Sequence, residues 1–189
     1  MTDTREQLQD RAEYYIRRGG YNSFSFRDLA NDLGMKSASV HYHFPTKADL
    51  GASVARRYTE RFIGSLKQGI TDSSTAGDYV ELLILVFHRE MTQTRQLCLF
   101  AILSAEKQLL SEAIQEAITT FYQLVLNWLI EAFARDMPAD SAEQRAIQVF
   151  ATLQGALLGA HALKNRKYFY IAVETLYLDL FYRVLDLPK

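Results

Sequence analysis

The chain has 189 residues, of which 49% are hydrophobic and 23% are charged, a composition typical of a globular protein with a buried core. Its net charge of −1 excludes binding of nucleic acid by bulk positive charge, and its single cysteine excludes an internal disulfide framework. The polar N-terminus lacks the apolar segment of a signal peptide, and no apolar run approaches the roughly 18 residues of a membrane span, so we expect a cytoplasmic protein without a membrane segment.

The charge is unevenly distributed along the chain. Residues 1–61 contain ten Lys or Arg and eight Asp or Glu, whereas the remaining residues contain eleven and fourteen. A slightly basic N-terminal part on an acidic body suits a specific DNA-binding protein whose second domain does not adhere to DNA.

Residues 20–50 predict two short helices joined by a tight turn, after a longer helix over residues 5–18. Ser25 and Asp28 have the spacing of a capping box, which predicts where the first short helix starts. Gly34 predicts where it ends, because the left-handed residue that follows a helix is least strained without a Cβ.

The second short helix is predicted over residues 37–43, with Val40 facing inward and Pro45 limiting its extension. Its outward face carries short or planar polar side chains that suit base edges and phosphates. Tyr42 and Lys47 are expected to contact DNA without being needed for the core. The whole is the pattern of a helix-turn-helix, whose second helix enters the DNA major groove. The alternative, a solvated polar helix in an ordinary helical hairpin, accounts for fewer of these positions.

This region resembles the tetracycline-repressor (TetR) family of one-component bacterial regulators. The residues that match the family pattern are glycines, helix caps, apolar positions and a few polar ones: Gly20, Tyr21, Phe24, Ser25, Asp28, Leu29, Ala30, Gly34, Met35, Ala38, Ser39, Val40, His43, Phe44, Lys47 and Leu50. The sequence departs from the pattern at Lys36, where the family usually has a Ser or Thr that caps the recognition helix. It also departs at His41, where a tyrosine commonly touches a phosphate.

The resemblance implies an N-terminal three-helix DNA-binding unit followed by a helical effector-binding and dimerisation domain. We place the first domain at residues 1–50 and the second at residues 51–189. The residues expected to bind DNA lie on the two short helices or beside them: Ser25, Arg27, Lys36, Ser37, Ala38, Ser39, His41, Tyr42, His43 and Lys47.

The rest of the chain also predicts helices, because apolar residues recur at three- and four-residue spacing and strand-like alternation is absent. Thr46 and Asp49 form a second capping box, which starts a helix that reaches about residue 69. The helices predicted after it cover five ranges: 76–94, 95–108, 109–136, 141–163 and 168–185. The expected fold class is therefore all-α.

The last two predicted helices are apolar on nearly every side, so other helices must cover them. They belong either to an internal core or to a four-helix bundle made with a second copy of the chain. The resemblance implies the dimer, and DNA geometry favours it because one short helix reads too few base pairs. The expected dimer interface includes small and large apolar residues of both helices: Gly155, Gly159, Leu163, Leu176 and Phe181.

No motif of an enzyme, cofactor or metal site is present, so we expect no catalytic residues and no metal. His41 and His43 are two residues apart on a helix and point in different directions, so they do not share an ion. An effector pocket is expected among the aromatic and polar residues of the helical domain, each of which is by itself more often a core residue: Phe62, Phe87, His88, Met91, Cys98, Phe100, Phe121, Trp128, Phe150 and Gln154.

The expected effector is a neutral apolar or a reactive molecule, because no buried cluster of Lys or Arg is evident for a highly anionic one. The segment CLFAILSAE, which begins at Cys98, resembles TetR-type repressors that sense electrophiles. The competing interpretation is that Cys98 is an inert buried residue.

The sequence thus predicts a homodimeric, sequence-specific DNA-binding repressor that a small effector releases from its operator. The resemblance implies that the effector moves the helix beginning at Thr46. The alternatives are a helical small-molecule-binding protein with vestigial DNA contacts, an electrophile- or redox-sensing repressor that uses Cys98 and, more remotely, a helical enzyme.

Overall fold

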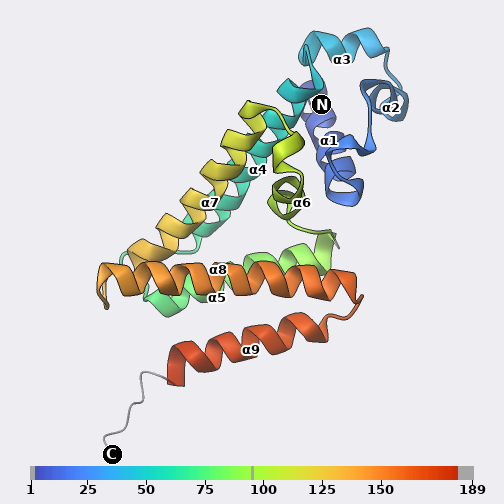
Figure 1. Cartoon of the computed structure of the whole chain (residues 1–189). Coiled ribbons are helices and arrows are strands. Elements are labelled where there is room, and N and C mark those ends of the chain that lie inside the picture. The colour runs from blue at the N-terminus through green and yellow to red at the C-terminus, as the bar shows by residue number, and fades with distance from the viewer. Residues whose placement is uncertain (1–2, 95, 183–189) are drawn as a thin grey trace, which may run out of the picture. The chain divides into compact units, whose positions relative to one another are not determined.

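A computed structural model of the chain describes residues 3–94 and 96–182, with side chains placed up to residue 178 in the last helix. The described residues are mostly helical and contain no strand, which confirms the all-α prediction (Figure 1). The α-helices are α1 (Thr4–Gly19), α2 (Phe26–Asp32), α3 (Ser37–His43), α4 (Lys47–Gln68), α5 (Ala76–Arg89), α6 (Leu99–Ala105), α7 (Glu112–Phe133), α8 (Ala139–Ala162) and α9 (Lys167–Tyr182). Short 3-10 turns cover Tyr21–Ser23 and Lys107–Leu109, and Glu90–Thr94 forms a π-helical turn. In this described part, no helix is both long and apolar enough to cross a membrane.

The chain forms two compact units. The first contains the chain up to Phe62 together with Cys98–Tyr122, and the second contains Ile63–Leu97 together with the chain from Gln123 onward. Helices α4 and α7 each contribute residues to both units.

The first unit is built around the apolar face of α1. Leu8, Ala12 and Ile16 of this helix are fully buried, as are Leu29 of α2 and Val40 of α3. Helix α6 also packs on α1. The three N-terminal helices therefore share one small core, and the face of α3 opposite Val40 is left to solvent.

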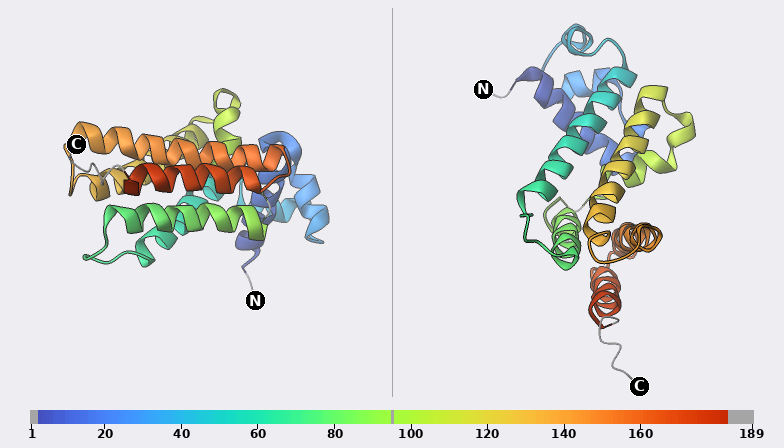
Figure 2. Two further views of the ribbon diagram at one scale, coloured as in Figure 1. Left: turned by 90° about the horizontal axis from the view of Figure 1, so that it is seen from below. Right: turned by 90° about the vertical axis from the view of Figure 1, so that its left-hand side faces the viewer.

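In the second unit, α8 and α9 run antiparallel, side by side (Figures 1 and 2), and α5 packs against α8. The rings of Phe87 and Phe150 meet edge to face, with centroids 6.2 Å apart. Helices α8 and α9 approach so closely that a Cβ on Gly159 would lie 2.3 Å from the ring of Tyr168. This contact needs glycine for space, because a larger residue would push the two helices apart.

The predicted element boundaries need three corrections. The helix predicted over residues 76–94 loses its α-helical geometry at Glu90, because the Thr92 and Thr94 hydroxyls donate to the carbonyl oxygens of His88 and Glu90. The next helix begins at residue 99 rather than 95, and residue 95 itself lies outside the described residues.

The helix predicted from residue 109 begins at Glu112, because Lys107–Leu109 takes up a 3-10 turn. The final helix was expected to reach residue 185, and residues 183–189 lie outside the described part.

Candidate functional site

The α2–α3 hairpin begins with the predicted capping box. The Asp28 amide donates to the Ser25 hydroxyl at 3.3 Å, and the Ser25 amide donates to the Asp28 carboxylate at 2.7 Å. The Ser25 hydroxyl, which donates to the Asp28 carboxylate at 2.7 Å, and the Ser25 amide together hold the pKa of Asp28 below its usual value. The turn closes at Gly34, whose φ is 63°, and the Met35 amide donates to the Ala30 carbonyl at 2.9 Å. A Cβ on Gly34 would meet nothing within 4 Å, so backbone conformation alone requires glycine here.

Helix α3 presents most of the predicted DNA-binding residues to solvent. Lys36, Ser37, Ala38 and His41 are exposed, and Tyr42 is 86% exposed although it is a large aromatic residue. Most large aromatic side chains bury most of their surface, so an aromatic ring this exposed is available to a partner.

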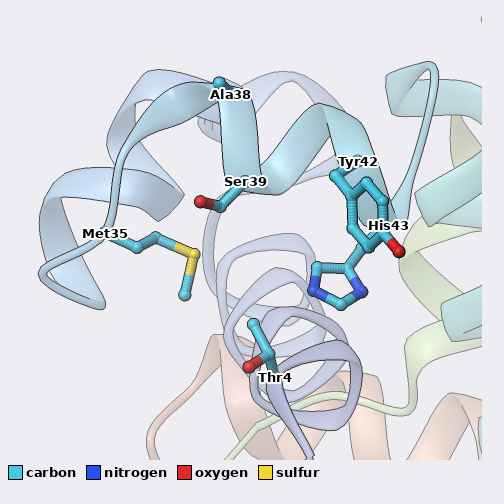
Figure 3. A pocket seen from close by; sticks show the side chains of 6 residues that line it. All are labelled: Thr4, Met35, Ala38, Ser39, Tyr42 and His43. Carbon is cyan, nitrogen blue, oxygen red and sulfur yellow. The ribbon is translucent and has the colours of Figure 1, made fainter.

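Ser39 and His43 are half-buried on the side of α3 that faces the start of α1. There they line a shallow hollow of about 450 Å³, which Figure 3 shows together with its other lining residues, Thr4, Met35, Ala38 and Tyr42. Two predicted contacts on α2, Ser25 and Arg27, are exposed.

His41 is exposed but is held on both sides. One of its ring nitrogens lies 3.3 Å from the Pro45 carbonyl oxygen, and its ring meets the Phe26 ring edge to face at 4.9 Å. These contacts fix the orientation of the imidazole, so His41 reaches a partner in one direction only.

Lys47 is half-buried, and its ammonium is held against the segment before α2. Its ammonium donates to the Phe24 carbonyl at 2.7 Å and lies 4.7 Å and 4.5 Å from the centroids of the Tyr21 and Phe24 rings. Burial lowers the pKa of Lys47, although the charges of Glu106 and Asp28 oppose this shift. The long stem carries the charge inward onto a carbonyl and two rings, so we now expect this side chain to contribute to the fold.

Three further links position the hairpin, and sequence reasoning missed them. The Arg5 guanidinium donates to the His43 carbonyl at 3.2 Å and so ties α1 to the end of α3. Arg11 and Tyr15 both donate to the Asp32 carboxylate, which ties α1 to the end of α2 and lowers the pKa of Asp32. No periodicity marks such residues, because they lie on the polar face of an amphipathic helix.

The third link joins α6 to the connection between α1 and α2. The Glu106 carboxylate accepts the Tyr21 amide at 2.9 Å, although 85 residues separate the two in sequence. A Cβ on Gly20, whose φ is 87°, would lie 2.3 Å from the same carboxylate. Gly20 therefore satisfies both a backbone conformation and a close approach.

Four of the predicted effector-pocket residues pack together in the first unit. The rings of Phe100 and Phe121 stack at 4.1 Å, and Phe62 meets Phe121 edge to face at 5.1 Å. Cys98 is 1% exposed at the start of α6, and the Tyr58 hydroxyl donates to its sulfur at 3.5 Å. These side chains fill the space between helices by contacting one another.

The other six lie in the second unit. Trp128 lies 4.6 Å from the Tyr79 ring, and a ring nitrogen of His88 lies 3.2 Å from the Tyr170 hydroxyl. Phe87 and Phe150 form the edge-to-face pair described above, and Met91 lies in the π-helical turn.

Gln154 is the unusual member of this set. Both its amide oxygen and its amide nitrogen are buried, and neither has a hydrogen-bond partner within the described part of the chain. An unpaired buried amide is costly, so a partner for it is to be expected.

The predicted dimer residues divide into two groups. Gly155 and Leu163 are exposed, as an interface with a second copy requires. Gly159 and Leu176 instead serve the chain itself, because Gly159 admits the Tyr168 ring and Leu176 is 3% exposed. The interface role expected of these two stays a prediction. The side chain of Phe181 lies outside the described residues.

Two protein-family profiles match the chain. Residues 10–54 match "Bacterial regulatory proteins, tetR family", and residues 79–175 match "Transcriptional regulator LmrA/YxaF-like, C-terminal domain". No curated protein matches the chain.

Similar solved structures include a TetR transcriptional regulator from Legionella pneumophila, which is 26% identical and has a TM-score of 0.88 over 95% of this chain and 98% of that one. A TetR-family regulator from Agrobacterium tumefaciens is also 26% identical, with a TM-score of 0.83 over 92% and 95% of the two chains. The regulator FadR from Bacillus subtilis, solved in complex with stearoyl-CoA, is 17% identical with a TM-score of 0.71 over 92% and 96%, and shares the fold.

Members of the matched family are DNA-binding regulators rather than enzymes, and they typically act as homodimers that respond to small molecules. The helix-turn-helix, the helical second unit and both family matches agree, and the chain belongs to the TetR family of bacterial transcriptional regulators.

Proposed function

We propose that this protein is a homodimeric, cytoplasmic repressor that binds operator DNA through α3 and releases it when a small effector binds the helical domain. The observation that carries the proposal is the two-sided character of α3, in which Val40 is fully buried while Tyr42 is 86% exposed. In functional terms residues 1–50 read DNA, and residues 51–189 bind the effector and the second subunit.

Within the hairpin, the DNA contacts divide into two roles. Ser37, Ala38 and Tyr42 lie on the exposed face of α3 and suit base edges in the major groove. Lys36 and Arg27 are exposed cations placed to meet phosphates. Ser25, Ser39, His41, His43 and Lys47 complete the surface or hold it in position.

The second subunit is proposed to cover an apolar stripe on α8. Ile147, Ala151, Gly155, Leu158 and Ala162 recur every three or four residues, and all five are exposed. An exposed apolar stripe of this length is unusual on a monomer, and a two-fold partner would bury it. Dimerisation would also supply the second α3 that an operator with two half-sites needs.

The effector is proposed to bind near the unpaired amide of Gln154. Phe87 and Phe150 supply apolar surface in the same unit, so a molecule with an apolar body and a polar group would match these residues. Release would follow from movement of α4 and α6, because Lys47 at the start of α4 and Glu106 after α6 both hold the connection beside Tyr21.

Electrophile sensing by Cys98 remains an alternative of the same class. The thiol is 1% exposed, so an electrophile would reach it only after the unit opens. If Cys98 is the sensor, Cys98→Ser should bind operator normally and fail to release it on treatment with maleimide. We expect wild type and variant to respond alike.

The experiment that tests the function is footprinting of the DNA upstream of the protein's own gene. Tyr42→Ala should weaken operator binding by about 1–3 kcal/mol, the usual value of such a contact. Leu109→Ala is the matched control, because Leu109 is 81% exposed in the same unit but lies outside the hairpin. Protection of the same site by Tyr42→Ala at the wild-type concentration would show that α3 does not read the DNA.

A further inference from the structure

A hollow of about 550 Å³ lies in the second unit. Its lining combines apolar side chains with polar and basic ones: Met91, Gln96, Leu157, Ala160, His161, Lys164 and Arg166. Met91 belongs to the π-helical turn, and the other contributors include the end of α8 and the turn before α9. The hollow therefore has an apolar floor and a basic edge.

The basic groups on this edge are available to a ligand. Neither Lys164 nor Arg166 forms an ion pair with any residue that the structure describes, and both are exposed. No carboxylate is among the lining residues. No lining residue therefore supplies a negative charge to the two cations.

The backbone is irregular on both sides of the hollow. On one side Glu90–Thr94 forms a π-helical turn, a geometry that is rare and often found at functional sites. On the other side Lys164 has a φ of 50°, and it is the sole non-glycine residue with positive φ in the described part of the chain. Such a conformation in a residue with a side chain is strained, and strain of this kind concentrates at binding sites.

The turn at Lys164 is of a kind that usually has a glycine, so a lysine at this position is unusual. The amides of Leu163, Lys164 and Asn165 donate to carbonyls of α8 at 3.0, 3.2 and 3.0 Å, which closes the helix in the way that normally uses glycine. A glycine would satisfy this turn with less strain. Lysine instead places an ammonium group at the edge of the hollow.

We propose that this hollow binds an amphipathic anion, a molecule with an aliphatic chain or apolar ring and a single carboxylate or similar acidic head group. The apolar part would lie on Met91, Leu157 and Ala160, and the head group would meet Lys164 and Arg166. This hollow is a second ligand site, because Gln154, Phe87 and Phe150 do not line it, and its regulatory use rests on the proposed function. Its ligand differs from the neutral or reactive effector expected from the sequence, because the fold brings Lys164 and Arg166 beside both Leu157 and the distant Met91.

The position of the hollow suits a regulatory site. The π-helical turn that contributes Met91 leads within a few residues to α6, and α6 leads to Glu106. Glu106 in turn accepts the Tyr21 amide of the DNA-binding unit. A ligand that changes the conformation of the π-helical turn therefore acts on the chain segment that leads to Glu106 and its hydrogen bond with Tyr21.

Decanoate and decanol are the probes that test the proposal, because they share a chain and differ in charge. Calorimetric titration of the full-length protein without DNA should show binding of decanoate and weaker binding of decanol. The double variant Lys164→Asn and Arg166→Gln should weaken decanoate binding by about tenfold or more, the usual effect of losing charge-assisted hydrogen bonds. Asparagine keeps the left-handed turn acceptable, so the fold should be retained.

Lys167→Gln is the matched control, since it removes a positive charge beside the same turn from a residue that does not line the hollow. It should leave decanoate affinity within about twofold of wild type, because an exposed charge outside the site is screened. The proposal is overturned if decanol binds as tightly as decanoate, if decanoate does not bind, or if the control loses as much affinity as the double variant.

Operator binding is measured separately, so the two proposals fail in different ways. If decanoate binding depends on Lys164 and Arg166 but the protein protects no DNA, the ligand proposal is supported and the repressor function is refuted. If the protein binds its operator but does not bind decanoate, the repressor function is supported and the ligand proposal is refuted.

Discussion

The α2–α3 and α8–α9 hairpins both contain a left-handed residue between their two helices, but the residue type differs. Each reverses its chain direction at one left-handed residue, which is Gly34 with a φ of 63° in the first and Lys164 with a φ of 50° in the second. Around Gly34 there is open space, whereas α8 and α9 are so close that Gly159 is needed to admit Tyr168. In one hairpin glycine serves the turn, and in the other it serves the contact between helices.

The exposed faces of the two hairpins differ as well. Helix α3 shows solvent a short polar face that includes Ser37 and His41, while α8 shows it an apolar stripe that includes Ile147 and Leu158. A polar face with an exposed aromatic suits nucleic acid, and an apolar stripe suits a second protein surface. The two faces thus fit the hairpin proposed to bind DNA and the hairpin proposed to meet the second subunit, and four changes test that assignment.

The largest effect is expected from a charge on the α8 stripe. Leu158 is 51% exposed, and Leu158→Glu would bury an unpaired carboxylate in the dimer, which costs roughly 3–5 kcal/mol. Sedimentation should show a folded monomer. Leu109→Glu, at an 81% exposed position outside the stripe, should remain dimeric. A dimer of unchanged affinity in Leu158→Glu would remove the assigned interface.

The next effect concerns the turn of the DNA-reading hairpin. Gly34→Ala forces a side chain into the left-handed region and should reduce the free energy of unfolding by about 1–2 kcal/mol, with a loss of operator affinity. Urea unfolding measures the first effect and footprinting the second. Gly64→Ala is the control, because this helical glycine also has open space around it and alanine there should stabilise α4 by roughly 0.5–1 kcal/mol. Equal effects of the two changes would contradict the role given to Gly34.

The reciprocal change in the other hairpin should have a smaller effect of opposite sign. Lys164→Gly relieves the left-handed strain but enlarges the freedom of the unfolded chain, so stability should rise by no more than about 1 kcal/mol. The urea midpoint checks this. A loss of stability would mean that the Lys164 side chain contributes more to the fold than to a ligand.

The smallest effect concerns acid. Hydrogen bonds lower the pKa of Asp28 in the folded state, so its contribution is fully present above the unfolded pKa near 4 and is lost as pH falls through the folded value. The start of α9 has a neutral counterpart, because the Lys167 amide donates to the Asn165 side chain at 3.0 Å. Between pH 5 and pH 3, amide exchange corrected for intrinsic rates should therefore accelerate in α2 and not in α9. Equal acceleration in both helices would show that acid acts on the whole protein.

The two hairpins also differ in how far sequence reasoning reached. The Ser25–Asp28 box and the limits of α3 were predicted correctly, because caps and glycines act within a few residues of where they occur. The structure alone revealed Arg5, Glu106 and the inward Lys47, since their partners lie 38, 85 and 23 residues away along the chain.

The hollow beside α8 was missed for a related reason. A lysine in a left-handed turn has no sequence signature, because glycine is the residue that a pattern leads one to expect there. Its apolar floor joins Met91 to Leu157, and no local periodicity connects two such distant segments. Caps and turns could thus be predicted from the sequence, whereas contacts between distant segments of the chain could not.

The contact of Trp128 with Tyr79 gives the protein an optical reporter of its own. Trp128 is the single tryptophan of the sequence, and its ring is buried in the second unit, where the Arg135 guanidinium also lies 5.3 Å from the Tyr79 ring. Indole emission therefore comes from one known place in the unit that is proposed to bind the effector. Intensity and wavelength can follow events in that unit without a dye, a label or an engineered residue, while the DNA-reading hairpin contributes no indole signal.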